Sequence, residues 1–188
     1  MVNSECHPFE PFLPEGARLL MLGTFPPSEK RWSMPFYYPN FQNDMWRIVG
    51  HCFFGDKQHF IADDGRHYRL AELKAFLTEQ GIALYDTCTR IVRTRNTASD
   101  KDLQVVEQTN IPALLQRLPQ CRAIVTAGQL ATTLCAGQLG VSEPRVGEYV
   151  EVASLRLYRM PSSSRAYPMP IEKKAEYYQR VFNFSLSQ

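Results

Sequence analysis

The chain has 188 residues, 44% of them hydrophobic and 21% charged, and a formal net charge of +2. This balance is typical of a soluble globular domain that buries its core without disulfide staples. No apolar run approaches the roughly 20 residues of a membrane span, and residues 1–16 lack the basic region and apolar core of a signal peptide. We therefore expect one domain over residues 1–188, located in the cytoplasm, or associated with the nucleoid if the source is bacterial.

The first part of the chain predicts an arm, a strand, a long loop and two helices. Residues 1–17 are rich in proline and predict an extended N-terminal arm. The apolar run over 19–22 predicts the first strand, over 18–22, and the chain breaks at Gly23. A loop dense in proline and aromatic residues then runs to Asn43, and such loops commonly form binding pockets. Apolar residues at helical spacing follow over 45–53 and 70–77.

The second part of the chain alternates short buried strands with amphipathic helices. Strands are predicted over 82–85, 123–126 and 155–160, with a short edge strand at 149–152, and helices over 111–118, 129–135 and 170–182. The polar residues 94–102 predict a loop, and its length favours a functional loop over a mere connector.

This alternation predicts an α/β fold with three layers, α/β/α, around a central, mostly parallel four-stranded sheet. In such sheets ligands bind beyond the carboxyl ends of the strands. Four unusual loops leave strands at that end and should face one crevice; their sequences are GTFPPS, DTCTR, TAGQ and PSSSR.

Cysteine and histidine patterns give no sign of a metal or another cofactor. The five cysteines are odd in number and far apart, no CxxC pair occurs, and the four histidines lack ligand spacing. We therefore expect no metal and no cofactor.

Basic residues gather in two segments, over 90–101 and 156–174. Such clusters near loops are compatible with binding to a phosphate backbone, and an ordinary solvated face fits them equally well. In PSSSR, three hydroxyls and a cation suit a phosphate oxygen, and a serine-rich turn that caps its own backbone is the alternative. GTFPPS lacks the pattern of a nucleotide phosphate loop.

Five segments together carry a resemblance to a known family. They are GTFPPS after the first strand, YYPNFQNDMWRI, GIALYDTCTR, TAGQLA, and MPSSS after the last strand. In this order the segments resemble the motifs of the uracil-DNA glycosylase superfamily. The nearer resemblance is to its branch of hypoxanthine-DNA glycosylases and mismatch-specific uracil glycosylases, and it spans about residues 18–182.

The resemblance implies a DNA repair enzyme that flips a deaminated base, uracil or hypoxanthine, into a pocket and hydrolyses its N-glycosidic bond. The partner would be damaged DNA, single- or double-stranded, and the protein a monofunctional, monomeric glycosylase that binds no membrane. Many members carry Asp or Asn at the third position of the first motif, and here that position is Phe25. Asn43 therefore becomes the candidate catalytic residue, although a helix cap is its alternative role.

The resemblance also implies the remaining site residues. The base would contact Gly23, Thr24, Phe25, Pro26, Tyr37, Tyr38 and Gly128, with Tyr38 as the stacking ring, and the DNA backbone would contact Ser28, Ser162, Ser163, Ser164 and Arg165. Asp86 fits either an acid at the edge of the core or an acid in the site. Two alternatives stay open: a catalytically silent nucleic-acid-binding relative, and a small-molecule hydrolase on the same fold.

Overall fold

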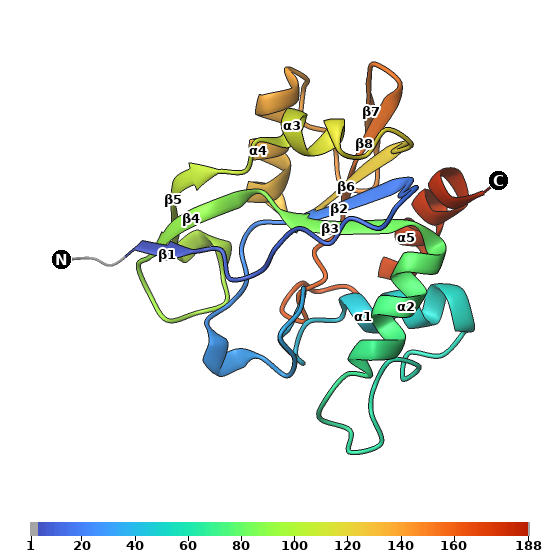
Figure 1. The fold of residues 1–188 in the computed structure, drawn as a ribbon. Helices are drawn as coiled ribbons and strands as arrows, with labels where there is room; N and C mark the ends of the chain where they lie inside the picture. The colour runs from blue at the N-terminus through green and yellow to red at the C-terminus, as the bar shows by residue number, and fades with distance from the viewer. Residues whose placement is uncertain (1–3, 188) are drawn as a thin grey trace.

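The structure is a computed structural model, and it describes residues 4–187. Its central sheet has five strands in the order β3-β2-β6-β8-β7 (Figure 1). The first four strands in this order are parallel, and β7 pairs with β8 in the antiparallel sense. Their bounds are β2 (Leu19–Gly23), β3 (Ile82–Asp86), β6 (Ala123–Ala127), β7 (Tyr149–Val152) and β8 (Leu155–Met160). The parallel part thus has the four strands expected, and the edge strand over 149–152 is the fifth.

Helices cover both faces of this sheet, which confirms the three-layer α/β/α fold. Residues Leu19 and Met21 of β2 pack in one core cluster, and Leu20 and Leu22 in the other, because successive side chains of a strand point to opposite faces. The first cluster lies under α1 (Met45–Phe54), α2 (Leu70–Gln80) and α5 (Ile171–Leu186), and the second under α3 (Ile111–Gln116) and α4 (Gln129–Leu139) (Figure 1). Because both faces are covered, all five residues of β2 are buried.

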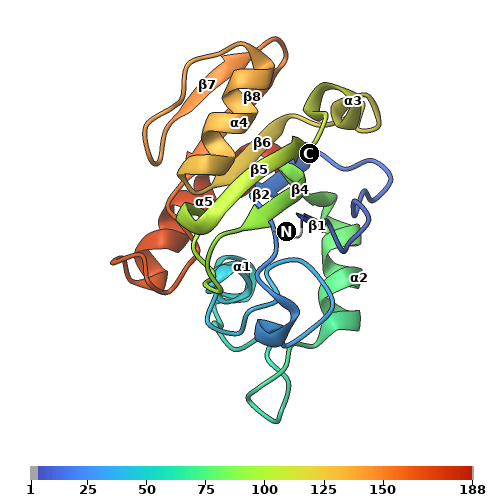
Figure 2. The ribbon, with the colours of Figure 1, turned by 90° about the vertical axis from the view of Figure 1, so that its left-hand side faces the viewer.

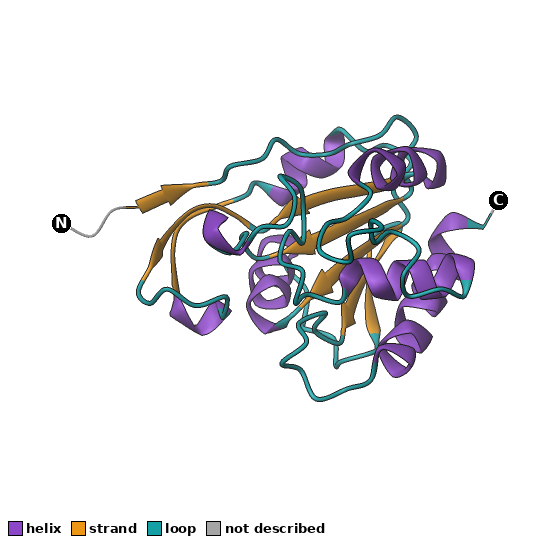
Figure 3. Ribbon diagram, turned by 90° about the horizontal axis from the view of Figure 1, so that it is seen from below, coloured by secondary structure: helices purple, strands orange, loops and turns teal. Residues whose placement is uncertain are grey.

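A second, antiparallel sheet was not predicted. It has the order β1-β4-β5, with β1 (Ser4–Cys6), β4 (Cys88–Arg93) and β5 (Leu103–Gln108), and it projects from one end of the molecule (Figures 2 and 3). Strand β4 begins two residues after β3 ends, so the two strands look like one strand and its exit loop in the sequence. Most of β5 is exposed, and its sequence lacks the apolar alternation that marks a half-buried strand.

The predicted loop over 94–102 is the tip of the β4–β5 hairpin, and it contains a short 3₁₀ turn at Asp100–Asp102. Residues 1–3 of the predicted N-terminal arm lie outside the described residues, and the rest of the arm contacts the body of the protein. Strand β1 pairs with β4 at three positions, and Phe12 forms an isolated bridge with Leu84. Within residues 4–187, no helix is both long and apolar enough to cross a membrane.

Candidate active site

A cleft of about 1230 Å³ opens at the carboxyl ends of the parallel strands. Its lining includes the loops that carry GTFPPS, TAGQ and PSSSR, as expected for a sheet of this kind. The prediction for DTCTR was wrong beyond its first residue, because only Asp86 lines the cleft and the chain after Thr87 turns away into β4. The tip of the β4–β5 hairpin, over residues 97–101, takes the place of that loop in the cleft wall.

The first-motif loop, Gly23–Pro27, forms one wall of the cleft. Its backbone is fixed because Gly23 and Thr24 accept hydrogen bonds from the amides of Thr87 and Cys88, at 2.9 and 3.1 Å. The Thr24 hydroxyl donates to Oδ2 of Asp100 at 2.7 Å. Burial raises the pKa of the Asp100 carboxyl, the hydrogen bond from Thr24 lowers it, and the charge of Asp86 raises it again.

Asp86 lies at the end of β3, where it is buried at the edge of the core and also lines the cleft. Its Oδ2 lies 2.8 Å from Nε2 of His7, and the two side chains are 9% and 3% exposed. The amide of Phe9 donates to Nδ1 of His7 at 3.1 Å. The His7 ring also lies edge-on to Phe25, with the ring centres 5.3 Å apart. The arm therefore forms a second layer behind the first motif.

Tyr37 and Tyr38 are neighbours in the chain and have different roles in the structure. Tyr38 lines the cleft, and its ring lies edge-on to Trp46 at 5.7 Å. The Tyr38 hydroxyl is buried and has no hydrogen-bond partner among residues 4–187. Burial raises its pKa well above the usual value. Tyr37 is 2% exposed, its hydroxyl donates to the Glu10 carbonyl, and it is absent from the cleft lining.

Asn43 lines the cleft and also serves the helix behind it. Its Oδ1 accepts a hydrogen bond from the amide of Met45, at the start of α1, at 2.9 Å. Its backbone bridges to Ser164, which joins the aromatic loop to the second-motif loop. The N-cap residue of α1 is Asp44, so Asn43 lies one position before the cap. Its bond to Met45 uses the amide oxygen and leaves the amide nitrogen as the group that can donate to a ligand.

The second-motif loop, Pro161–Arg165, is held by buried charges. Ser162 to Arg165 all line the cleft. The amide of Asp44 donates to the Ser163 carbonyl and Nζ of Lys174 to the Ser164 carbonyl, both at 2.8 Å. The hydroxyl oxygens of Ser162 and Ser164 accept from backbone amides two residues ahead, as in a serine-rich turn. Since each hydroxyl still has a hydrogen to donate, the turn remains compatible with a phosphate contact.

The other predicted residues divide between the cleft and its surroundings. Phe25, Pro26 and Gly128 line the cleft. Gly128 has a φ of 113°, which is strained for any other residue, and it directly precedes α4. Ser28 lies outside the lining, and its hydroxyl donates to Asn96 of the hairpin at 3.3 Å.

Four basic residues from different elements also line the cleft: Arg31, Lys101, Arg159 and Arg165. The three arginines of the first basic segment pair with acids instead, Arg90 with Glu107, Arg93 with Glu5 and Arg95 with Asp102. Only part of each basic segment therefore faces the cleft. Within residues 4–187 no three His, Cys, Asp or Glu side chains come together as metal ligands.

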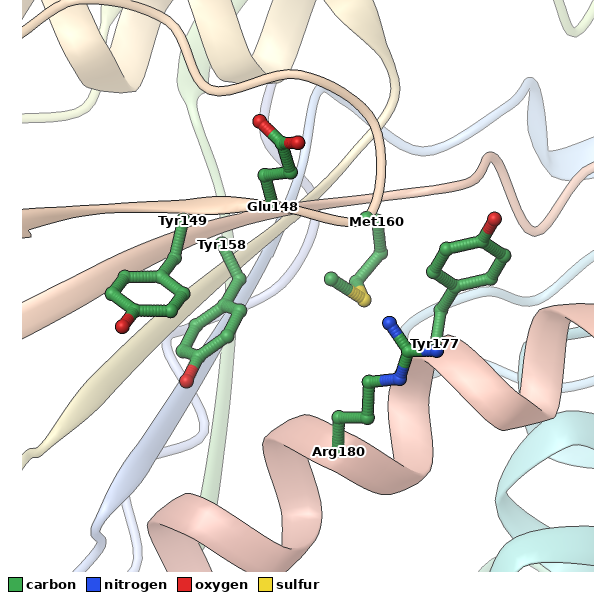
Figure 4. A pocket seen from close by; sticks show the side chains of 7 residues that line it. Glu148, Tyr149, Tyr158, Met160, Tyr177 and Arg180 are labelled. Atoms are coloured by element: carbon green, nitrogen blue, oxygen red, sulfur yellow. The ribbon is translucent and has the colours of Figure 1, made fainter.

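A second, smaller pocket of about 390 Å³ lies between the β7–β8 edge and α5 (Figure 4). Figure 4 shows Glu148, Tyr149 and Tyr158 on the strand side and Tyr177 and Arg180 on the helix. Of the motif segments, only MPSSS reaches this pocket, through Met160.

The sequence analysis missed His7 and Asp100. A lone histidine in a proline-rich arm has no spacing signal, and Asp100 lies 76 positions from Thr24. The one available signal was the length of the polar loop over 94–102, which favoured a functional role.

Comparison with solved structures shows a similar fold. A solution NMR structure of a candidate uracil DNA glycosylase from Methanosarcina acetivorans matches with a TM-score of 0.67 and 23% sequence identity, over 95% of this chain and 96% of that one. No protein-family model matches the chain, and a search of curated proteins finds no match either.

Proposed function

We propose that this protein is a DNA glycosylase of the uracil-DNA glycosylase superfamily, nearest to its hypoxanthine and mismatch-specific branch. It would excise a deaminated base, uracil or hypoxanthine, from damaged DNA. The observation that carries the proposal is the convergence of separate motif segments on one cleft, in a fold similar to that of a candidate uracil DNA glycosylase. The protein would act as a single-domain monomer in the cytoplasm.

The cleft suits a flipped base. Extrusion of a base from the duplex costs a few kcal/mol, and stacking on an aromatic ring is worth about 1–3 kcal/mol per base. Phe25 and Tyr38 both present rings to the cleft, and the Tyr38 hydroxyl is free of protein partners among the described residues. One ring can thus offset much of the extrusion cost.

The second-motif loop and the rim suit the DNA backbone. Ser162, Ser163 and Ser164 offer hydroxyl donors, and Arg165 offers a half-exposed guanidinium whose side chain is 47% exposed. Charged and hydroxyl donors of this kind position a nucleic acid through its phosphates without reading its sequence.

In the proposed reaction Asn43 donates its amide N–H to the base or the attacking water. A neutral amide is a poor base, so its contribution is orientation and stabilisation of charge on the departing base. A bifunctional lyase would need a pocket amine to attack the sugar. Lys101 is the one lysine in the cleft lining of the described chain, so borohydride trapping on wild type and Lys101→Ala tests the monofunctional assignment. We expect no trapped complex with either protein.

The test is a cleavage assay on single- and double-stranded DNA carrying uracil, hypoxanthine or xanthine, followed by alkali. We expect abasic sites with at least one lesion. Salt-sensitive binding without abasic sites would instead support the silent relative, which Phe25 in the first motif favours. No DNA binding at low salt would overturn both readings and leave the small-molecule hydrolase.

Asn43→Ala should lower the excision rate at least about tenfold, equal to about 1.4 kcal/mol. The matched control is Asn110→Ala, because Asn110 caps α3 through a 2.9 Å bond to the Ala113 amide and lies away from the cleft lining. Both variants lose an amide side chain that accepts a 2.9 Å hydrogen bond from the first turn of a helix, so only Asn43→Ala should lose activity beyond its loss of stability. An unchanged rate in Asn43→Ala would remove Asn43 from the mechanism.

A further inference from the structure

Hydrolysis of an N-glycosidic bond consumes water, so a group that accepts a proton from the water accelerates it. In this chain the first motif cannot supply that group, because its third position is Phe25. Asn43 is neutral, and its amide oxygen already accepts a hydrogen bond from the Met45 amide. The base must therefore come from another part of the cleft wall.

Two carboxylates line the cleft in the described chain, Asp86 and Asp100. Asp86 is turned toward the protein: Oδ2 pairs with His7, and Oδ1 packs so closely on Gly23 that a β-carbon there would lie 2.5 Å from it. Asp100 differs, because Oδ2 accepts from Thr24 and no protein donor binds Oδ1 within residues 4–187. Asp100 also reaches across the cleft, and its Oδ2 lies 3.7 Å from the place of a β-carbon on Gly128.

The hairpin that carries Asp100 is fastened to the first-motif side of the cleft. Arg93 donates to the Pro26 carbonyl at 3.0 Å, and Arg31 donates to the Asn96 carbonyl at 3.2 Å. Inside the tip, Thr97 donates to Asp102 at 2.5 Å. These bonds hold the carboxylate at a fixed place, which a catalytic base requires.

We propose that Asp100 is the general base of the glycosylase reaction, supplied by the β4–β5 hairpin in place of a first-motif acid. The proposal rests on the proposed function. The Oδ1 atom accepts a proton from a water molecule whose oxygen forms a bond to C1′ of the sugar. The N-glycosidic bond breaks, and its electron pair leaves with the base, which then takes up a proton. The products are the free base and an abasic site with a hydroxyl on C1′.

The electrostatics of the cleft favour this role. Burial and the neighbouring Asp86 raise the pKa of the Asp100 carboxyl, opposed by the hydrogen bond from Thr24. A carboxylate with a raised pKa is the stronger base. Activity requires the ionised form, so the rate should fall as the pH falls through the pKa of Asp100.

The test is single-turnover excision by Asp100→Asn on the lesion that wild type cleaves best, across a range of pH. The variant keeps the size of the side chain and an acceptor for Thr24. We expect a loss of about 10²–10⁴-fold at neutral pH, unchanged affinity for the lesion DNA, and loss of the acidic limb of the pH profile. Asp63→Asn is the matched control, because this carboxylate is 98% exposed and lies outside the cleft lining, and the variant should keep the acidic limb.

Thr24→Val separates positioning from a purely structural effect. It removes the bond that lowers the pKa of Asp100, so the acidic limb should move to higher pH. A folded Asp100→Asn with a rate within about threefold of wild type, or with the wild-type pH profile, would overturn the inference and leave the glycosylase assignment intact. Wild type that excises no lesion would overturn both.

Discussion

The two motif loops face each other across the cleft and are built differently. The second-motif loop is tied by buried charges, because Asp44 lies near Arg165, Lys174 and Arg47, at 3.1, 3.8 and 3.8 Å. The Asp44 and Lys174 side chains are 5% and 0% exposed. On the first-motif side, by contrast, the buried Tyr38 hydroxyl and one oxygen of Asp100 have no protein partner in the described chain.

This difference indicates that the polar groups of the second-motif side support the fold, whereas some on the first-motif side are left for a ligand or water. Buried polar groups in native proteins are almost always hydrogen-bonded, so a group without a protein partner is a place where a ligand or water can bind. The satisfied network fixes the position of the second-motif loop on the cleft wall. The unsatisfied groups belong to cleft-lining residues, and the proposed function assigns them to the base and the attacking water.

The largest expected effect is on stability, at Asp44. Asp44→Ala leaves the buried Lys174 amine and the Arg47 guanidinium without their carboxylate, which costs about 3–5 kcal/mol of the free energy of unfolding. Urea denaturation measures this loss. The control is Asp63→Ala, whose side chain is 98% exposed in its pair with Arg69 and which should change stability by less than about 0.5 kcal/mol. Equal losses in the two variants would break the contrast between the loops.

A smaller effect tests the unsatisfied hydroxyl. Tyr38→Phe removes a buried group without a protein partner, so the free energy of unfolding should rise by about 1 kcal/mol while the excision rate falls. The matched control is Tyr178→Phe, because the buried Tyr178 hydroxyl donates to the Pro161 carbonyl at 3.2 Å. The free energy of unfolding of that variant should instead fall by about 1 kcal/mol. Urea denaturation should show a higher free energy of unfolding for Tyr38→Phe and a lower one for Tyr178→Phe. A loss of stability in Tyr38→Phe would contradict the contrast between the two sides of the cleft.

The smallest effect concerns Arg165. Arg165→Ala should leave stability nearly unchanged, because Asp44 keeps Lys174 and Arg47 as neighbours. DNA binding should weaken for every sequence alike, and the slope of log affinity against log salt should become shallower by about 0.9 for one lost phosphate contact. Arg156→Ala is the control, since this side chain lies over the Tyr149 and Phe184 rings, and its salt slope should match wild type. Equal slopes for all three proteins would take Arg165 out of the DNA interface.

The central layers were predictable because their signals are local. Strands such as β2 and β6 are short, buried and mostly apolar, and the rule that ligands bind at strand ends placed the cleft. The second sheet was not predictable, because β5 is mostly exposed and its pairing with β4 leaves no apolar pattern. Thr24 with Asp100 and His7 with Asp86 are contacts 76 and 79 positions apart, which one sequence cannot reveal. Tyr37 and Tyr38 are the same residue type, so the sequence alone does not show which one is buried in the core and which one lines the cleft. The backbone at Tyr38 has a φ of 50°, an uncommon conformation that the sequence does not signal.

The two ends of the described chain lie on opposite sides of the molecule (Figure 1), and this matters for the preparation of the protein. Strand β1 leads directly into His7, which is 2.8 Å from Asp86 in the cleft wall. The Ser187 carbonyl instead accepts from Arg18 and Arg122, which precede β2 and β6 at the edge of the sheet away from the cleft. An affinity tag for purification therefore belongs after α5. A truncated protein that starts at β2 would lack His7, and with it part of the layer that packs behind Phe25 and Asp86.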